Sequence, residues 1–184
     1  KINLSLDRTN WKHGKSYVNA FAAFGSIGEI GSLVSIKMLD NKGGNSKGRD
    51  RIELAKKVVM QYGKDNIENI TGDREFFSFE FVSWLHEEGL PYTIRVRENL
   101  DFVQGYLSRA TKRGETFKNV GIMMPNGNKH YCDLSIKKLE KEYLILASSR
   151  IKSPFLAYRK RWQIETFFKM LKTGGFNIED TKIR

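Results

Sequence analysis

Three acidic residues stand apart from the other carboxylates because of what surrounds them. Asp7 in LDRT and Asp73 in GDRE each follow an apolar run and are each followed directly by arginine, while Glu165 lies in the cationic segment YRKRWQIETFFKMLK. Carboxylates brought close together repel one another, so they would share a site only with a cation between them, and oxygen ligands favour Mg²⁺ or Mn²⁺. A pair of such ions roughly 3.5–4 Å apart would activate a water or hydroxyl and support the leaving oxygen, which is chemistry for phosphoryl transfer.

Each acid also has a simpler interpretation. An aspartate at the end of a strand is often only a turn former or a helix cap. Glu165 lies four residues from both Arg161 and Lys169, and ion pairs at that spacing contribute only about 0.2–0.5 kcal/mol each on a solvated helix. Taken alone, these residues leave a metal site and an ordinary charged surface both open.

The positions of the two aspartates depend on strands that alternating apolar residues predict. Residues 2–7 (INLSLD) are expected to form a strand that ends at Asp7 and gives way to a loop, and a short strand near 67–71 leads to Asp73. In a sheet with crossover helices the ends of such strands gather at one edge. Two aspartates far apart in the sequence can therefore become neighbours.

The remaining elements follow from the same patterns. We expect strands at 17–24, 30–39 and 90–96, amphipathic helices at about 50–62 and 78–88, and a last helix that begins near Ser153 or Pro154. Between about 100 and 150 the sequence changes to short alternating runs, which indicate an antiparallel β insertion. The chain is thus expected to be an α/β protein in three parts, 1–99, 100–150 and 151–184.

The segment from Tyr158 to Lys172 is expected to lie on one helix with two different faces. At about 100° per residue, Arg161, Glu165, Lys169 and Lys172 fall within roughly 60° to one side of Tyr158 or 20° to the other, and Ile164, Phe167 and Leu171 lie near the opposite pole. If the apolar face packs across the sheet, Glu165 can complete a trio with the two aspartates, and the cations face a polyanion.

Composition agrees with a polyanionic partner. The 184 residues, 40% of them hydrophobic, suffice for one sizeable core and a small appended module. Lys and Arg number 32 against 21 acidic residues, a net charge of +11, which favours nucleic acid or an anionic membrane surface as partner. The single cysteine, Cys132, excludes an internal disulfide and any multi-cysteine zinc site, and we expect it to be a buried strand residue in a protein of the reducing cytosol.

Neither end of the chain nor its most apolar window indicates a membrane protein. The window 17–36 is interrupted by Asn19, Glu29 and three glycines, so a buried hairpin is the better interpretation than a membrane span. No signal peptide is evident, and the chain begins at Lys1 in the middle of an apolar pattern, which suggests a fragment of a longer protein.

Three ordered blocks carry a resemblance to a known family. They are LDRTNW around Asp7, TGDREF around Asp73, and the set Tyr158, Arg161, Glu165 and Lys172, separated by two, three and six residues. Together they resemble the DDE transposases of bacterial insertion sequences, in the branch marked by a YREK signature (insertion sequence family four). The resemblance runs in order from about Ile2 to Lys172.

The resemblance implies a fold and a spacing. The expected fold is a ribonuclease H-like core, a mixed sheet flanked by helices, with an antiparallel β insertion before the last catalytic helix. The first two acids are 73 − 7 = 66 residues apart and the last two 165 − 73 = 92, and the longer gap accommodates the insertion of this branch.

The resemblance also implies roles for particular residues. Asp7, Asp73 and Glu165 are the expected catalytic ligands of Mg²⁺, with Mn²⁺ as a substitute. Tyr158, Arg161 and Lys172 are expected to contact phosphates near the transposon end, Trp162 to stack on a flipped base, and Arg74 to support the acids or contact phosphate.

The function implied is metal-dependent cleavage at a transposon end followed by strand transfer into target DNA. The implied partners are transposon-end and target DNA and, in the full-length protein, a second copy of the chain, in the bacterial cytoplasm and away from membranes. Two alternatives stay open: a non-catalytic DNA-binding remnant of a transposase, and a ribonuclease H-like nuclease without a joining step.

Overall fold

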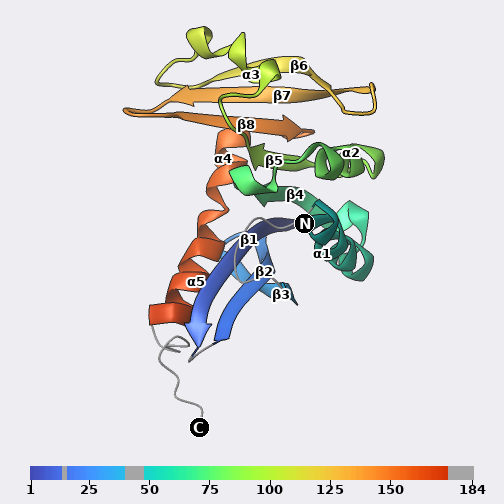
Figure 1. Cartoon of the computed structure of the whole chain (residues 1–184), viewed down its shortest axis with the longest axis vertical. Coiled ribbons are helices and arrows are strands. Elements are labelled where there is room, and N and C mark those ends of the chain that lie inside the picture. Colours follow the sequence, from blue (N-terminus) through green and yellow to red (C-terminus); the bar gives the residue numbers. More distant parts are fainter. Residues whose placement is uncertain (14–15, 40–47, 174–184) are drawn as a thin grey trace.

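A mixed sheet of eight strands forms the centre of the protein in a computed structural model, which describes residues 1–13, 16–39 and 48–173 (Figure 1). The strands are β1 (Ile2–His13), β2 (Ser16–Ile27), β3 (Ile30–Met38), β4 (Ile67–Gly72), β5 (Tyr92–Arg95), β6 (Glu115–Met123), β7 (Lys129–Lys138) and β8 (Tyr143–Ser149). Their order is β3-β2-β1-β4-β5-β8-β7-β6, in which β4 is parallel to both β1 and β5 and the other pairs are antiparallel. The expected α/β class with a mixed sheet is confirmed.

Helices lie on both faces of this sheet. They are α1 (Gly48–Tyr62), α2 (Phe79–Glu87), α3 (Asp101–Gln104), α4 (Pro154–Arg159) and α5 (Trp162–Thr173), with short 3-10 turns η1 (Lys64–Asn66), η2 (Arg74–Phe76) and η3 (Leu107–Arg109). Figure 1 shows α1 and α2 on one side of the sheet and α4 and α5 on the other. The helices near 50–62 and 78–88 are therefore confirmed to within a residue or two at each end.

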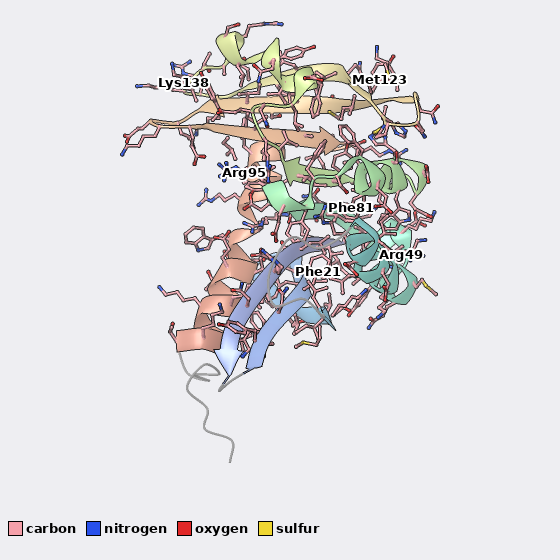
Figure 2. The ribbon with its side chains drawn as sticks, in the orientation of Figure 1. Phe21, Arg49, Phe81, Arg95, Met123 and Lys138 are labelled. Atoms are coloured by element: carbon pink, nitrogen blue, oxygen red, sulfur yellow. The ribbon has the colours of Figure 1, made fainter. Side chains whose placement is uncertain are left out.

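Strand β2 supplies both cores because successive side chains of a strand point to opposite faces. Phe21 and Ala23 belong to the large core under α1 and α2, whereas Ala22 and Phe24 form a smaller cluster with Ile164 and Phe168 of α5. Phe21 stacks on Phe76 with the ring centroids 5.2 Å apart, in the side-chain layer that Figure 2 shows between the sheet and the first two helices. The second cluster fixes α5 across the sheet face opposite α1.

The first strand is longer than the sequence pattern predicts. The loop expected after Asp7 is wrong, because β1 continues to His13 and pairs with β2 from Asn3↔Ser26 to His13↔Ser16. The continuation is built largely from polar residues, so it lacks the apolar alternation by which a strand is recognised. A long two-stranded ladder with β2 holds it in place instead.

The β insertion continues the main sheet. Strands β6, β7 and β8 form the expected antiparallel run, and β8 pairs with β5 from Tyr92↔Ser149 to Arg95↔Leu146. The boundaries at 99/100 and 150/151 remain a prediction. What the topology adds is that the insertion and the core share one continuous set of backbone hydrogen bonds.

The expected single helix through Tyr158 is wrong, because the chain turns at Lys160 and Arg161 between α4 and α5. At this turn the Arg161 N–H donates to the Tyr158 carbonyl at 3.0 Å and the Ile164 N–H donates to the Arg161 carbonyl at 3.1 Å, both one residue tighter than α-helical bonds. The turn leaves Arg161 only 7% exposed. Residues 174–184, the end of the expected third part, lie outside the described residues.

Candidate active site

The register between β1 and β4 brings the two aspartates together. The last Cα partners of this parallel pair are Leu6 and Gly72. Asp7 and Asp73 are the next residues on the two strands, so they leave the end of the ladder side by side. Asp7 continues in β1, and Asp73 starts the 3-10 turn η2. The predicted proximity thus comes from the end of a shared ladder, although β1 itself does not end there.

Arg161 joins the first and the third acid. Its Nη2 lies 3.1 Å from Asp7 Oδ2, and its Nη1 donates to Glu165 Oε1. The second oxygen of the Asp7 carboxylate accepts the Arg8 N–H at 2.9 Å. Glu165 lies in the first turn of α5 with its side chain 42% exposed, whereas that of Asp7 is 16% exposed. The guanidinium therefore holds a buried carboxylate from the sheet next to a solvent-facing one from the helix.

The charges in this site act on one another strongly. Burial raises the pKa of Asp7, and the charge of Arg161 and the Arg8 N–H offset this rise only in part. Burial by itself lowers the pKa of Arg161, but the negative charges around it, Asp7 first and Asp73 and Glu165 among the others, outweigh burial and leave the pKa raised. The Arg161 guanidinium thus interacts electrostatically with all three acids.

Asp73 has its own contacts on the other side. Its Oδ1 accepts the Tyr158 hydroxyl at 3.4 Å and lies 4.0 Å from Arg95 Nη1. Burial raises the pKa of Tyr158, so its hydroxyl stays protonated and acts as a donor. Arg95 is fixed in turn by Glu142, whose Oε2 accepts Arg95 Nη2 at 2.7 Å. Glu142 lies in the turn between β7 and β8, so the insertion contacts the environment of Asp73.

The carboxylates fit a hard divalent cation in type but are not assembled around one. Within the part of the chain that the structure describes, no three His, Cys, Asp or Glu side chains form a group that could hold a metal ion. The donors are all carboxylate oxygens, the ligands that Mg²⁺ and Mn²⁺ favour. Positive charge is already accommodated between two of them, in the form of the Arg161 guanidinium. The donor type therefore suits the ion, whereas the positions of two of the acids are set by their pairing with Arg161.

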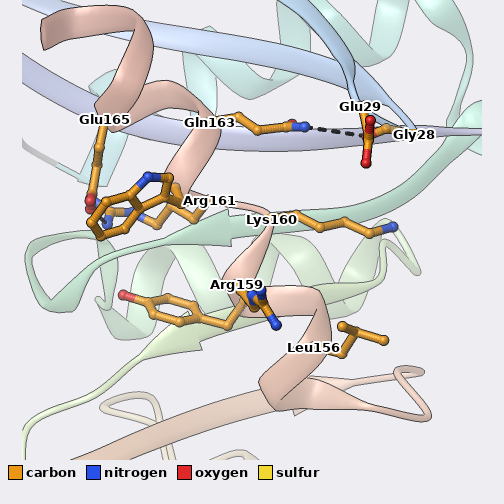
Figure 3. A pocket seen from close by; sticks show the side chains of 10 residues that line it. Gly28, Glu29, Leu156, Arg159, Lys160, Arg161, Gln163 and Glu165 are labelled. Carbon is orange, nitrogen blue, oxygen red and sulfur yellow. Dashed lines mark hydrogen bonds and ion pairs between the residues drawn. The ribbon is translucent and has the colours of Figure 1, made fainter.

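A cavity of about 750 Å³ opens beside Glu165 along the α4–α5 turn (Figure 3). Its polar lining includes Arg159 and Lys160, and Gln163 closes one side by donating to the Gly28 carbonyl at 3.3 Å. Trp162 also lines it, with 70% of the residue exposed. An exposed indole beside several cations is the kind of surface on which a nucleic-acid base stacks.

The other residues singled out in the sequence lie at the margins of the site. Lys172 Nζ donates to the Asn10 carbonyl of β1 at 2.8 Å, and Arg74 Nη2 lies 3.6 Å from Glu142 Oε2. Sequence reasoning missed Arg95 and Glu142 altogether. The one sequence signal for Arg95 was that it is a basic residue at the end of a strand next to the strand that leads to Asp73. Glu142 lies in a charged turn, and no sequence signal marks it as a site residue.

Comparisons with known proteins bear on the family and the fold of the chain. The profile of a family described as "Transposase DDE domain" matches residues 31–184, a range that includes Asp73 and Glu165 and begins after Asp7. Among solved structures, a cryo-EM structure of a piggyBac transposase synaptic complex with hairpin DNA is similar, with a TM-score of 0.62 and 16% identity. The similarity covers 92% of this chain and 40% of the piggyBac transposase chain, so this chain shares the fold of that protein and spans less than half of that protein's length.

A search of curated proteins gave no match. In the described residues, no helix has the length and apolar character needed to cross a membrane.

Proposed function

The chain belongs to the transposase DDE domain family, and from this premise we propose that it cleaves a phosphodiester bond at a transposon end and joins the freed 3′ hydroxyl to target DNA. The observation that carries the proposal is the meeting of Asp7 and Glu165 at Arg161, with Asp73 leaving the same ladder end as Asp7. This set brings together acids from two neighbouring strands, β1 and β4, and from the helix α5 that packs across the sheet.

Asp7, Asp73 and Glu165 would hold the metal, Mg²⁺ with Mn²⁺ as a substitute. When bound, the ion supplies a Lewis acid that activates the attacking oxygen and stabilises the leaving one. The protein's own part is to fix the carboxylates: the ladder end sets Asp7 and Asp73, and the packing of α5 sets Glu165. Arg161 pairs with both Asp7 and Glu165, so its guanidinium lies next to two of the three carboxylates that would hold the ion.

DNA would approach along the α4–α5 turn. Arg159 and Lys160 line the large cavity there, and Trp162 offers a stacking surface worth about 1–3 kcal/mol per base. Arg161, once released from Glu165, and Lys172 would contact phosphates. Each neutralised phosphate on duplex DNA makes the logarithmic dependence of affinity on salt steeper by about 0.9.

The spacing of Tyr158, Arg161, Glu165 and Lys172 supports placing the chain in the YREK-signature branch of bacterial insertion sequences. From that placement we infer a bacterial cytoplasmic protein whose full-length form acts as a homodimer. Transposon-end DNA and target DNA are the partners this proposal requires. The net charge of +11 is consistent with both.

The proposal is tested by neutralising two acids without changing their shape. Asp7→Asn and Glu165→Gln are each expected to abolish Mn²⁺-dependent cleavage of end DNA in a gel assay while retaining DNA affinity. Glu29→Gln is the matched control, since Glu29 is an exposed acid that lines the same cavity and contributes nothing to the trio. Cleavage by both acid variants at the rate of the control would rule out these ligands. Precleaved end DNA tests the joining step, because a nuclease without joining yields no strand-transfer product.

A further inference from the structure

A second cavity, of about 420 Å³, lies next to the turn that follows Asp73. Its lining comes from α1, η2, the start of α2 and the segment after β5, and it shares no residue with the cavity at Trp162. The lining side chains that bear on a ligand are those of Arg51, Arg74, Arg97, Ser78, Phe77 and Phe79. The cavity thus combines cations, a hydroxyl and two aromatic rings.

Two of the three arginines are available to a ligand. Arg97 is exposed and makes no hydrogen bond or ion pair with any other described residue. Arg74 is about half exposed, and its one ion pair, with Glu142, is 3.6 Å long. Arg51 differs, because it is only 5% exposed and its guanidinium lies over the Phe76 ring, 5.8 Å from the centroid. Arg51 therefore forms a wall of the cavity, and Arg74 and Arg97 supply its free positive charge.

The one acid in the lining does not cancel this charge. Glu75 Oε2 is paired with Arg8 Nη2 at 3.2 Å. Planar guanidinium groups match the geometry of phosphate oxygens and bind them bidentately. The cavity is consequently suited to backbone phosphates, and contacts to phosphates carry no information about base sequence.

The cavity is linked to Asp73 through the chain. Arg74 is the residue directly after Asp73, and Arg97 lies two residues beyond Arg95, whose Nη1 is 4.0 Å from Asp73 Oδ1. A joining reaction needs two DNA segments at one set of acids. One cavity carries the exposed Trp162 and lies beside Glu165, and the other gathers Arg74 and Arg97 after Asp73.

We propose that the Arg74–Arg97 cavity binds backbone phosphates of the target DNA during joining. This inference rests on the proposed function, and it assigns the second DNA segment to a second surface. Contacts to phosphates carry no base-sequence information, so they suit a DNA whose sequence is not fixed.

The test uses Arg97→Gln and a charge-matched control. Arg113→Gln removes an equally exposed arginine that has no hydrogen bond or ion pair among the described residues and lines neither cavity. The protein is first bound to precleaved end DNA, and the affinity for a labelled random-sequence duplex is then measured by fluorescence anisotropy at several salt concentrations. Arg97→Gln is expected to weaken target binding about tenfold and to make the salt slope shallower by about 0.9. Joining should fall in parallel, while cleavage of intact end DNA stays at the level of the control.

Two results would overturn the inference. In one, Arg97→Gln matches Arg113→Gln in target affinity, salt slope and joining. In the other, Arg97→Gln weakens binding of end DNA as much as binding of target, which would make the cavity part of the end-binding surface. The anisotropy readout needs no catalysis. A wild-type protein that neither cleaves nor joins DNA would refute the proposed function. If its duplex affinity still falls on Arg97→Gln, the cavity remains assigned as a surface that binds DNA phosphates.

Discussion

Replacing Arg161 with methionine should destabilise the metal-free protein and make its stability more sensitive to Mn²⁺. The substitution keeps the length and apolar stem of the side chain but removes the guanidinium that contacts Asp7 and Glu165. Two carboxylates then face each other with no cation between them. A divalent ion that enters the site would supply the missing charge.

The size of the loss follows from the burial of the three groups. Removing one partner of a buried ion pair costs about 3–5 kcal/mol. Glu165 is 42% exposed, so solvent screens its part, and we expect a loss near the lower limit, about 3 kcal/mol. For a protein of this size that corresponds to a Tm lower by about 6–12 °C. Saturating Mn²⁺ at a hundred times its Kd would restore about 2.7 kcal/mol.

Differential scanning calorimetry with and without Mn²⁺ measures both effects. Arg159→Met is the control, because Arg159 is an exposed arginine two residues away with no ion pair among the described residues. Wild-type protein should gain less from Mn²⁺ than Arg161→Met, since the ion must first displace the guanidinium from Glu165. The reasoning is wrong if Arg161→Met melts with the control, or if Mn²⁺ stabilises the wild type as much as the variant.

Two further predictions concern the packing. Ile164→Ala should lower the free energy of unfolding by about 2–5 kcal/mol in a urea titration, because Ile164 is fully buried in the cluster that fixes α5. The control Met170→Ala replaces a 54% exposed residue of the same helix and should change the free energy of unfolding by less than about 0.5 kcal/mol. Equal losses in the two variants would contradict this packing. Burial raises the pKa of Cys132 to about 12, so little of its thiol is ionised at pH 8. Iodoacetamide at pH 8 should therefore label Cys132 only after the protein is denatured. Stoichiometric labelling of the native protein would contradict the burial of this thiol.

The parts of the fold that the sequence predicted are those governed by short-range patterns. Ser78 begins α2 as expected of an N-cap, with its hydroxyl oxygen accepting the Phe81 N–H at 3.3 Å. The strand before Asp73 has five buried residues out of six, and its isoleucines Ile67 and Ile70 were the local signal for it. Cys132 is buried in β7, as its alternating surroundings indicated. In each case the deciding interactions lie within a few residues.

The parts that could not be predicted depend on partners far away in the chain. The polar continuation of β1 is a strand because β2 pairs with it, and no local pattern reports that ladder. The turn at Arg161 coincides with contacts to Asp7, more than 150 residues earlier. The contact between Glu142 and Arg95 likewise depends on how β8 aligns with β5. Propensity alone carries no information on such pairings.

Because Leu6 pairs with Gly72, insertions and deletions should disturb the acidic site when they fall in the strands that lead to Asp7 and Asp73, and should leave it intact when they fall in distant turns. One residue added or lost within β1 ahead of Asp7 would turn that carboxylate to the opposite face of the sheet, because strand side chains alternate. Length changes at the tip around Gly127, which joins β6 to β7 far along the chain from any of the acids, would leave the alignment untouched. Related sequences should therefore vary in length at such outer turns and keep the spacing within β1 and β4 constant.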